Sequence, residues 1–241
     1  MIFDIAIIVI AILFSGSLVL FIPFKKNAIK LLLSFSGAFL LGVTVFNILP
    51  GIYTAKVSIM YAGGLILLGF LLQIILEIFS HGIEHGHVHT HHGHSKNYIY
   101  LLSISLYIHS FLEGLPLGSR THEHVGEDLL WGIVIHNLPI AFSYAFLLKS
   151  EKFSNPKILL ALLLFASITP AGMVLGNYIQ YNLAWESFNS YALAMATGIF
   201  LHISTTIIFE SGENHRYNIR KFIAILMGFA GAYIPHLFHS H

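Results

Sequence analysis

The chain contains no cysteine and very little charge. Only 10% of its 241 residues are Asp, Glu, Lys or Arg, whereas soluble chains average roughly 25%. Without cysteine, neither disulfides nor thiolate metal sites can form. The net charge of +1 gives no electrostatic attraction to phosphate, so we expect no nucleic-acid partner. So few charges cannot cover a soluble globule of this length.

Apolar residues and histidine are abundant instead. Hydrophobic residues make up 56% of the chain, and the 16 His outnumber either the basic or the acidic side chains. A bilayer-spanning helix needs about 20 mostly apolar residues. The apolar runs show no alternation of the kind that membrane β-barrels require, which predicts an all-α membrane protein. Eight spans are predicted, at 4–24, 29–50, 57–80, 98–118, 129–148, 156–179, 190–209 and 221–238.

The basic residues of the connections predict the orientation of these spans. Ten Lys and Arg fall on one side of the predicted bundle, and only Lys56 and Arg120 fall on the other. The side rich in Lys and Arg is normally cytoplasmic. The protein is therefore expected in the cell membrane (plasma or inner membrane), with both termini on the outer side. The first span lacks a basic start and a cleavage site and is interpreted as a retained helix. Residues 1–241 are therefore expected to form one transmembrane domain.

Ionisable groups at membrane depth are costly and usually mark a site or a pathway. Within the predicted spans, such groups lie far from the ends only at His109, Glu113, His136 and His202. His109 and Glu113 are four residues apart, so they share one helix face and can hold one cation between them. The alternative is a neutral, hydrogen-bonded pair that joins two helices. His202 stands alone on its span and is compatible with either a ligand or a core residue.

Prolines accompany the histidines on two successive spans. Pro116 follows His109 and Glu113 in HSFLEGLPLG, and Pro139 follows His136 in HNLPIAF. Irregular backbone at membrane depth is tolerated where it is buried in protein or lines a cavity. Zinc and similar divalent ions bind three or four nitrogen and oxygen ligands, and the His109–Glu113–His136 set supplies three. This pattern predicts a mid-membrane metal site.

Two further groups of histidine lie in predicted connections. The cytoplasmic loop 81–97 has a composition typical of metal-binding tracts, although an inert polar linker is the alternative. Its histidines are His81, His85, His87, His89, His91, His92 and His94. On the outer side, His122 and His124 lie among acidic residues in the connection 119–128. That connection either raises the local cation concentration or is simply solvated.

Three motifs together resemble the ZIP (Zrt/Irt-like) family of divalent metal transporters. HSFLEG at 109–114 looks like the family's span-4 motif, HNLPIAF at 136–142 resembles its span-5 motif, and residues 31–51 are similar to its span 2. The resemblance implies His109, Glu113 and His136 as transport-site ligands, with Ser110 and Asn137 as weaker partners. It also implies two inverted three-helix repeats, spans 1–3 and 6–8, around spans 4 and 5. Homodimers and alternating access are implied as well.

Several positions depart from the family pattern. Ile140 stands where many members have a second carboxylate in span 5, and Thr169 stands where some have an acid before the span-6 proline. Asn47 and Gly51 replace residues of a span-2 motif that often reads H-x-x-P-E. A single-metal site is therefore favoured over a two-metal site. We place Asn47 and His202 along the pathway.

The sequence thus predicts a carrier of a divalent metal ion into the cytoplasm rather than an enzyme, with no catalytic cofactor. Zinc is the favoured ion, and Fe²⁺, Mn²⁺ and Cd²⁺ remain open because imidazole and carboxylate serve all of them. The alternative is a membrane di-iron desaturase or hydroxylase using the His clusters, although its H-x-x-H-H boxes are missing. An intramembrane metalloprotease would need H-E-x-x-H, which is absent. A passive scaffold would have no use for the buried His and Glu set.

Overall fold

The structure is a computed structural model, and it describes residues 1–22, 26–55, 57–80, 82–83, 96–118, 123–185, 187–210 and 219–239. Every regular element within these ranges is helical, which confirms the predicted all-α class. In chain order the elements are α1 (Ile2–Phe21), α2 (Lys26–Val43), η1 (Thr44–Ile48), α3 (Leu49–Thr54), α4 (Ile59–Ser80), α5 (Lys96–Gly114), η3 (Leu115–Gly118), α6 (Glu123–Ser150), α7 (Asn155–Asn182), α8 (Phe188–Glu210) and α9 (Ile219–His239).

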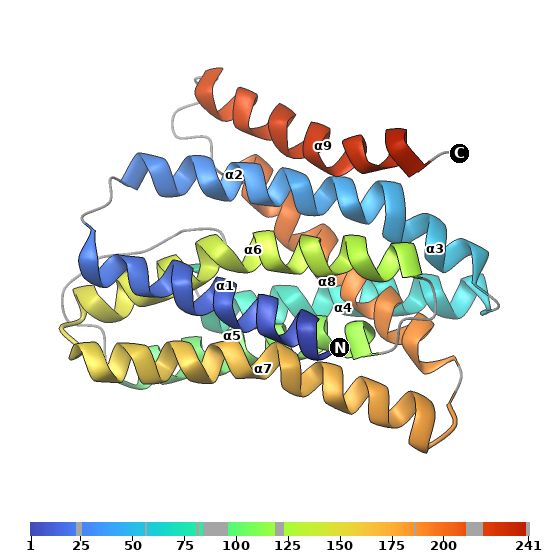
Figure 1. Cartoon of the computed structure of the whole chain (residues 1–241), viewed down its shortest axis with the longest axis horizontal. Coiled ribbons are helices and arrows are strands. Elements are labelled where there is room, and N and C mark those ends of the chain that lie inside the picture. The colour runs from blue at the N-terminus through green and yellow to red at the C-terminus, as the bar shows by residue number, and fades with distance from the viewer. Residues whose placement is uncertain are drawn as a thin grey trace.

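Seven of the described helical stretches are long and apolar enough to cross a bilayer. They are Ile2–Phe21, Ala28–Thr54, Ile59–Ser80, Asn97–Gly118, Val125–Ser150, Asn155–Asn182 and Phe188–Phe209. These stretches match the first seven predicted spans. The eighth predicted span, 221–238, falls within α9, which packs along α2 but is not among the seven (Figure 1). The eighth crossing and the inverted repeats stay predictions.

The helices pack in two groups. α4 packs mainly against α8, and α2 packs mainly against α9. On the other side of the bundle, α1 packs against α6 and α7, and α5 packs against α7 (Figure 1). Contacts of α2 with α6 and of α4 with α5 join the two groups. The candidate ligands on α5 and α6 therefore belong to one group, with α4 of the other group beside α5.

Glycines allow very close backbone approach between α4 and α8. A Cβ at Gly69 of α4 would collide with the backbone carbonyl of Met195, and a Cβ at Gly198 of α8 would collide with that of Ile66. Small residues at helix contacts let transmembrane backbones approach one another. We call this contact the α4–α8 seam.

A second glycine contact joins α5 to α7. A Cβ at Gly114, the last residue of α5, would collide with the carbonyl of Thr169. A Cβ at Gly172 of α7 would collide in turn with the carbonyl of Phe111. We call this contact the α5–α7 seam. It fixes the C-terminal turn of α5, which carries Glu113, directly against α7.

Proline and a π-turn make the helices irregular near the candidate site. After Gly114 the chain continues as the 3-10 turn η3, which contains Pro116. Pro139 lies inside α6, where the preceding carbonyl of Leu138 accepts a hydrogen bond from Ser15 Oγ of α1 at 2.5 Å. Proline lacks the backbone N–H that a regular helix needs, so Pro116 and Pro139 cannot donate to the carbonyl one turn earlier. Between α2 and α3, the π-helical turn η1 contains Asn47.

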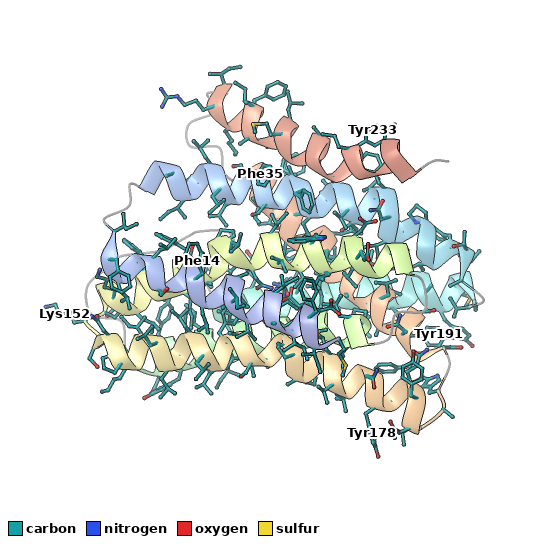
Figure 2. The ribbon with its side chains drawn as sticks, in the orientation of Figure 1. Phe14, Phe35, Lys152, Tyr178, Tyr191 and Tyr233 are labelled. Atoms are coloured by element: carbon teal, nitrogen blue, oxygen red, sulfur yellow. The ribbon has the colours of Figure 1, made fainter. Side chains whose placement is uncertain are left out.

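Different side chains mark the two ends of the bundle. Lys152, in the turn between α6 and α7, lies at one end, and Tyr178 and Tyr191 lie at the other (Figure 2). Tyrosine is enriched at membrane interfaces, and Lys is enriched on the cytoplasmic side. The start of α1 and the end of α9 lie at the tyrosine end (Figure 1). This arrangement is compatible with the predicted orientation.

The connection before α6 is shorter than the sequence predicted. α6 begins at Glu123, so the prediction of a loop through residue 128 is wrong and His124 lies in the first turn of the helix. Negative side chains near a helix N-terminus are favourable because they face the positive end of the helix dipole. Glu127 and Asp128 lie in the second turn of α6 rather than in a loop.

Candidate functional site: a buried His–Glu–His cluster

Two neighbouring helices supply the five predicted ligands. α5 carries His109, Ser110 and Glu113, and α6 carries His136 and Asn137. His109 and His136 lie near the middle of the membrane-length stretches Asn97–Gly118 and Val125–Ser150. All five residues have 0% exposure. The structure thus buries all five side chains and places the two histidines near mid-helix.

Glu113 is the centre of the polar contacts. Asn137 Nδ2 donates a hydrogen bond to Glu113 Oε1 at 2.6 Å, and Thr169 Oγ1 of α7 donates to the same oxygen at 3.5 Å. His109 Nε2 lies 3.4 Å from the other oxygen, Oε2. A buried carboxylate is costly unless it is hydrogen-bonded or paired. Side chains from three helices therefore converge on this carboxylate.

The two histidine rings face the same region. Their centroids are 6.0 Å apart, with an angle of 81° between the ring planes. Because Zn–N bonds measure about 2.0–2.1 Å, two imidazoles that share one zinc ion have centroids roughly 5–6 Å apart. The observed separation lies at the upper end of that range. A small ring movement would let His109 and His136 share one ion.

Several buried oxygens of these five residues have no hydrogen-bond partner among the described residues. They are Ser110 Oγ, Asn137 Oδ1 and Glu113 Oε2. Buried polar atoms are usually satisfied, so each exception calls for an explanation such as an ion. All three can donate a lone pair to a cation. Within the described ranges, no group of three or more His, Asp or Glu side chains stands ready to hold a metal.

Gln73 of α4 is a buried neighbour that the sequence analysis missed. Its Oε1 lies 3.2 Å from His109 Nδ1, and both side chains have 0% exposure. The site prediction rested on ionisable groups at membrane depth, whereas Gln73 carries an uncharged amide. A glutamine inside the apolar run LLQII was the available signal.

A second polar pair lies one helical turn further along α4. Glu77 Oε2 is 2.6 Å from His202 Nε2 of α8, and the ring of Phe70 packs against the His202 imidazole with centroids 5.0 Å apart. The pair is partly accessible, since the side chains of His202 and Glu77 are 11% and 24% exposed. The lone histidine of the sequence therefore has a carboxylate partner, which comes from the other side of the α4–α8 seam.

The structure says less about the other residues that the sequence predicted for the metal pathway. Asn47 is 6% exposed in η1, which packs against α6 and α8. His122 lies outside the described residues, as do His81 and the other histidines of the loop 81–97. Their roles stay predictions.

The sequence was also compared with known proteins. The family model described as ZIP Zinc transporter matches residues 95–234. Protein zntD of Dictyostelium discoideum is 30% identical over 165 residues, which cover 62% of this chain and 24% of that protein. Zinc transporter ZIP1 of Danio rerio is 26% identical over 148 residues, covering 60% and 49%. Zinc transporter YKE4 of Saccharomyces cerevisiae is 26% identical over 186 residues, covering 67% and 53%. The chain thus spans about a quarter to a half of these relatives' lengths.

Proposed function

Because this chain belongs to the ZIP zinc transporter family, we propose that it carries a divalent metal ion, with zinc favoured, across a membrane through the His109–Glu113–His136 site. The relatives reported above that are named zinc transporters support the choice of ion. Their names give no support to the alternative of a di-iron desaturase or hydroxylase, and the family consists of transporters rather than enzymes.

The observation that carries this proposal is the set of unsatisfied oxygens around two buried imidazoles. Ser110 Oγ, Asn137 Oδ1 and Glu113 Oε2 can complete the ligand shell of an ion held by His109 and His136. With one carboxylate against a doubly charged ion, the loaded site keeps a net positive charge. Such a site binds weakly enough to release its ion, which suits a carrier better than a structural centre.

We further propose that the ion leaves toward the cytoplasm past Glu77 and His202. Residues 73 and 77 are one turn apart on α4, so the helix runs from the buried cluster to this partly exposed pair. The predicted His-rich loop follows α4 in the sequence. Alternating access would expose the cluster to each side in turn. The homodimer remains a prediction of the family resemblance.

The test is zinc uptake into proteoliposomes that contain the purified chain. We expect Glu113→Ala and His109→Ala to abolish uptake while the protein still inserts, because each removes a ligand from a buried set. The matched control is Glu151→Ala, which removes a carboxylate from the turn between α6 and α7 and should leave uptake unchanged. Undiminished zinc accumulation in Glu113→Ala would refute the site. Parallel assays with Fe²⁺, Mn²⁺ and Cd²⁺ rank the ions.

A further inference from the structure

We propose that Gln73 is a positioning residue that keeps His109 in the tautomer able to bind metal. The inference rests on the proposed function, because it concerns how one ligand of that site is prepared. Gln73 comes from α4, whereas the ligands of the site come from α5 and α6. Its side chain contacts the ligand His109.

The hydrogen bond itself sets the tautomer. Gln73 Oε1 lies 3.2 Å from His109 Nδ1, and an amide oxygen can only accept a hydrogen bond. The ring proton of neutral His109 therefore sits on Nδ1. Its other nitrogen, Nε2, then carries a lone pair on the side where Glu113 Oε2 lies 3.4 Å away. A metal-binding imidazole commonly donates its second N–H to an oxygen in this way, which fixes both the tautomer and the ring orientation.

Glu113 would otherwise favour the wrong tautomer. A carboxylate this close to Nε2 attracts a proton to that nitrogen, and an Nε2–H···Oε2 hydrogen bond would then use up both groups. That state is a mutually hydrogen-bonded pair, in which His109 Nε2 offers no lone pair to an ion. Gln73 disfavours that state because its Oε1 accepts a hydrogen bond from a proton on Nδ1. The side chain thus decides whether His109 and Glu113 form a closed pair or an open pair of ligands.

The hydrogen bond also joins the two packing groups. Gln73 lies on the helix that the α4–α8 seam binds to α8, and His109 lies on the helix that the α5–α7 seam binds to α7. Ser105 Oγ of α5 donates to the carbonyl of Leu76 of α4 at 2.6 Å, so a second polar contact crosses the same boundary. Sliding of one group past the other would separate these atoms. Gln73 therefore orients His109 in the arrangement of helices seen here.

The experiment compares Gln73→Met with Gln73→Glu in the full-length purified protein. Methionine has a similar length but no amide oxygen, whereas glutamate keeps an acceptor at the same reach. We expect Gln73→Met to weaken zinc binding by about 10- to 100-fold, the usual effect of removing the outer partner of a metal-ligating histidine. We expect Gln73→Glu to retain most of the affinity. Gln180→Met makes the same change at the chain's other glutamine and should bind zinc like the wild type.

A spectroscopic signature separates positioning from general destabilisation. In ¹⁵N-histidine NMR spectra of the zinc-free protein, the His109 signal is assigned by its loss in His109→Ala. It should report a proton on Nδ1 in the wild type and on Nε2 in Gln73→Met. A wild-type His109 protonated on Nε2, or unchanged zinc affinity in Gln73→Met, would overturn the inference. Failure of the proposed function looks different, because zinc would then bind His109→Ala and the wild type equally well.

Discussion

The side-chain amide of Asn137 donates a hydrogen bond to the carboxylate of Glu113 through its nitrogen and keeps its oxygen without a partner among the described residues. The Asn137 Nδ2 and Glu113 Oε1 atoms lie 2.6 Å apart. The two residues lie on different helices, α6 and α5, and both have 0% exposure. The amide therefore stabilises the carboxylate without neutralising it and leaves an oxygen that a cation can use.

This relationship predicts that Asn137→Asp lowers the stability of the zinc-free protein and raises its affinity for zinc. The substitution removes the N–H donor to Glu113 and places a second negative charge beside it. Loss of a buried hydrogen bond costs about 1–3 kcal/mol, and the repulsion adds to that loss. We expect a lower melting temperature in chelator and a larger zinc-dependent increase than in the wild type. Thermal unfolding in detergent measures both quantities.

The matched control for this comparison is Asn182→Asp, at the exposed end of α7. It makes the same chemical change away from the cluster and should alter neither melting temperature. An Asn137→Asp protein that melts like the wild type both with and without zinc would contradict the assignment of Asn137 to the site.

His136 should be required for stabilisation by zinc. An ion that binds only the folded chain stabilises it by about 2.7 kcal/mol when present at 100 times its dissociation constant. His136→Ala removes one of the two imidazoles of the cluster, so we expect most of this zinc-dependent stabilisation to disappear. Tyr181→Ala serves as the control, since it removes an exposed aromatic ring near the end of α7. An equal zinc effect in His136→Ala and the wild type would exclude this ligand.

Hydropathy predicted the first seven spans because apolar runs of this length have few alternatives in a bilayer. It was less accurate at the helix ends. α6 begins at Glu123 rather than near residue 129, because acidic side chains that look like a solvated loop also favour a helix N-terminus. Residues 221–238 are apolar enough to suggest a span, yet α9 is not among the seven candidates. Its crossing therefore rests on the sequence alone.

The candidate site was predictable only where it depends on spacing along one helix. The four-residue separation of His109 and Glu113 places them on one face. The grouping of His136 with them was predicted from a second span with the same His and Pro pattern and from the family resemblance, and it requires both α5 and α6 to pack against α7. Gln73 and its contact with His109 depend on tertiary packing that no local pattern encodes. The same is true of Glu77 and His202, which are 125 residues apart and meet across the α4–α8 seam.

The Glu77–His202 pair should affect the rate of uptake more than the binding of the ion. It lies outside the buried cluster and is partly accessible, as expected for a group along an exit path. We expect Glu77→Gln and His202→Ala each to lower the maximal rate of zinc uptake while the half-saturating concentration changes little. Initial rates in proteoliposomes over a range of zinc concentrations separate the two parameters.

A double-mutant cycle tests whether the two side chains act together. Because their Oε2 and Nε2 atoms lie 2.6 Å apart, the double variant should lower the rate no further than the more severe single variant. Independent, multiplicative losses would show that Glu77 and His202 act separately. A higher half-saturating concentration in either single variant would instead assign that residue to the binding site.

The α4–α8 seam should tolerate no side chain at Gly69. A Cβ at this position would collide with the backbone carbonyl of Met195, which cannot rotate away as the end of a flexible side chain can. Gly69→Ala must therefore push α4 away from α8, and overpacking of this kind typically costs about 1–3 kcal/mol. We expect a clearly lower melting temperature in detergent. Because Glu77 and His202 also meet across this seam, slower zinc uptake should accompany the loss.

Gly63→Ala is the matched control because it makes the same change on the same helix. A Cβ at Gly63 would meet nothing within 4 Å in this chain, so the added methyl group requires no movement of α8. The two variants differ only in what the new atom touches. We therefore expect Gly63→Ala to melt and transport like the wild type. Equal destabilisation by both substitutions would mean that loss of glycine itself, rather than close approach of α4 to α8, causes the effect at Gly69.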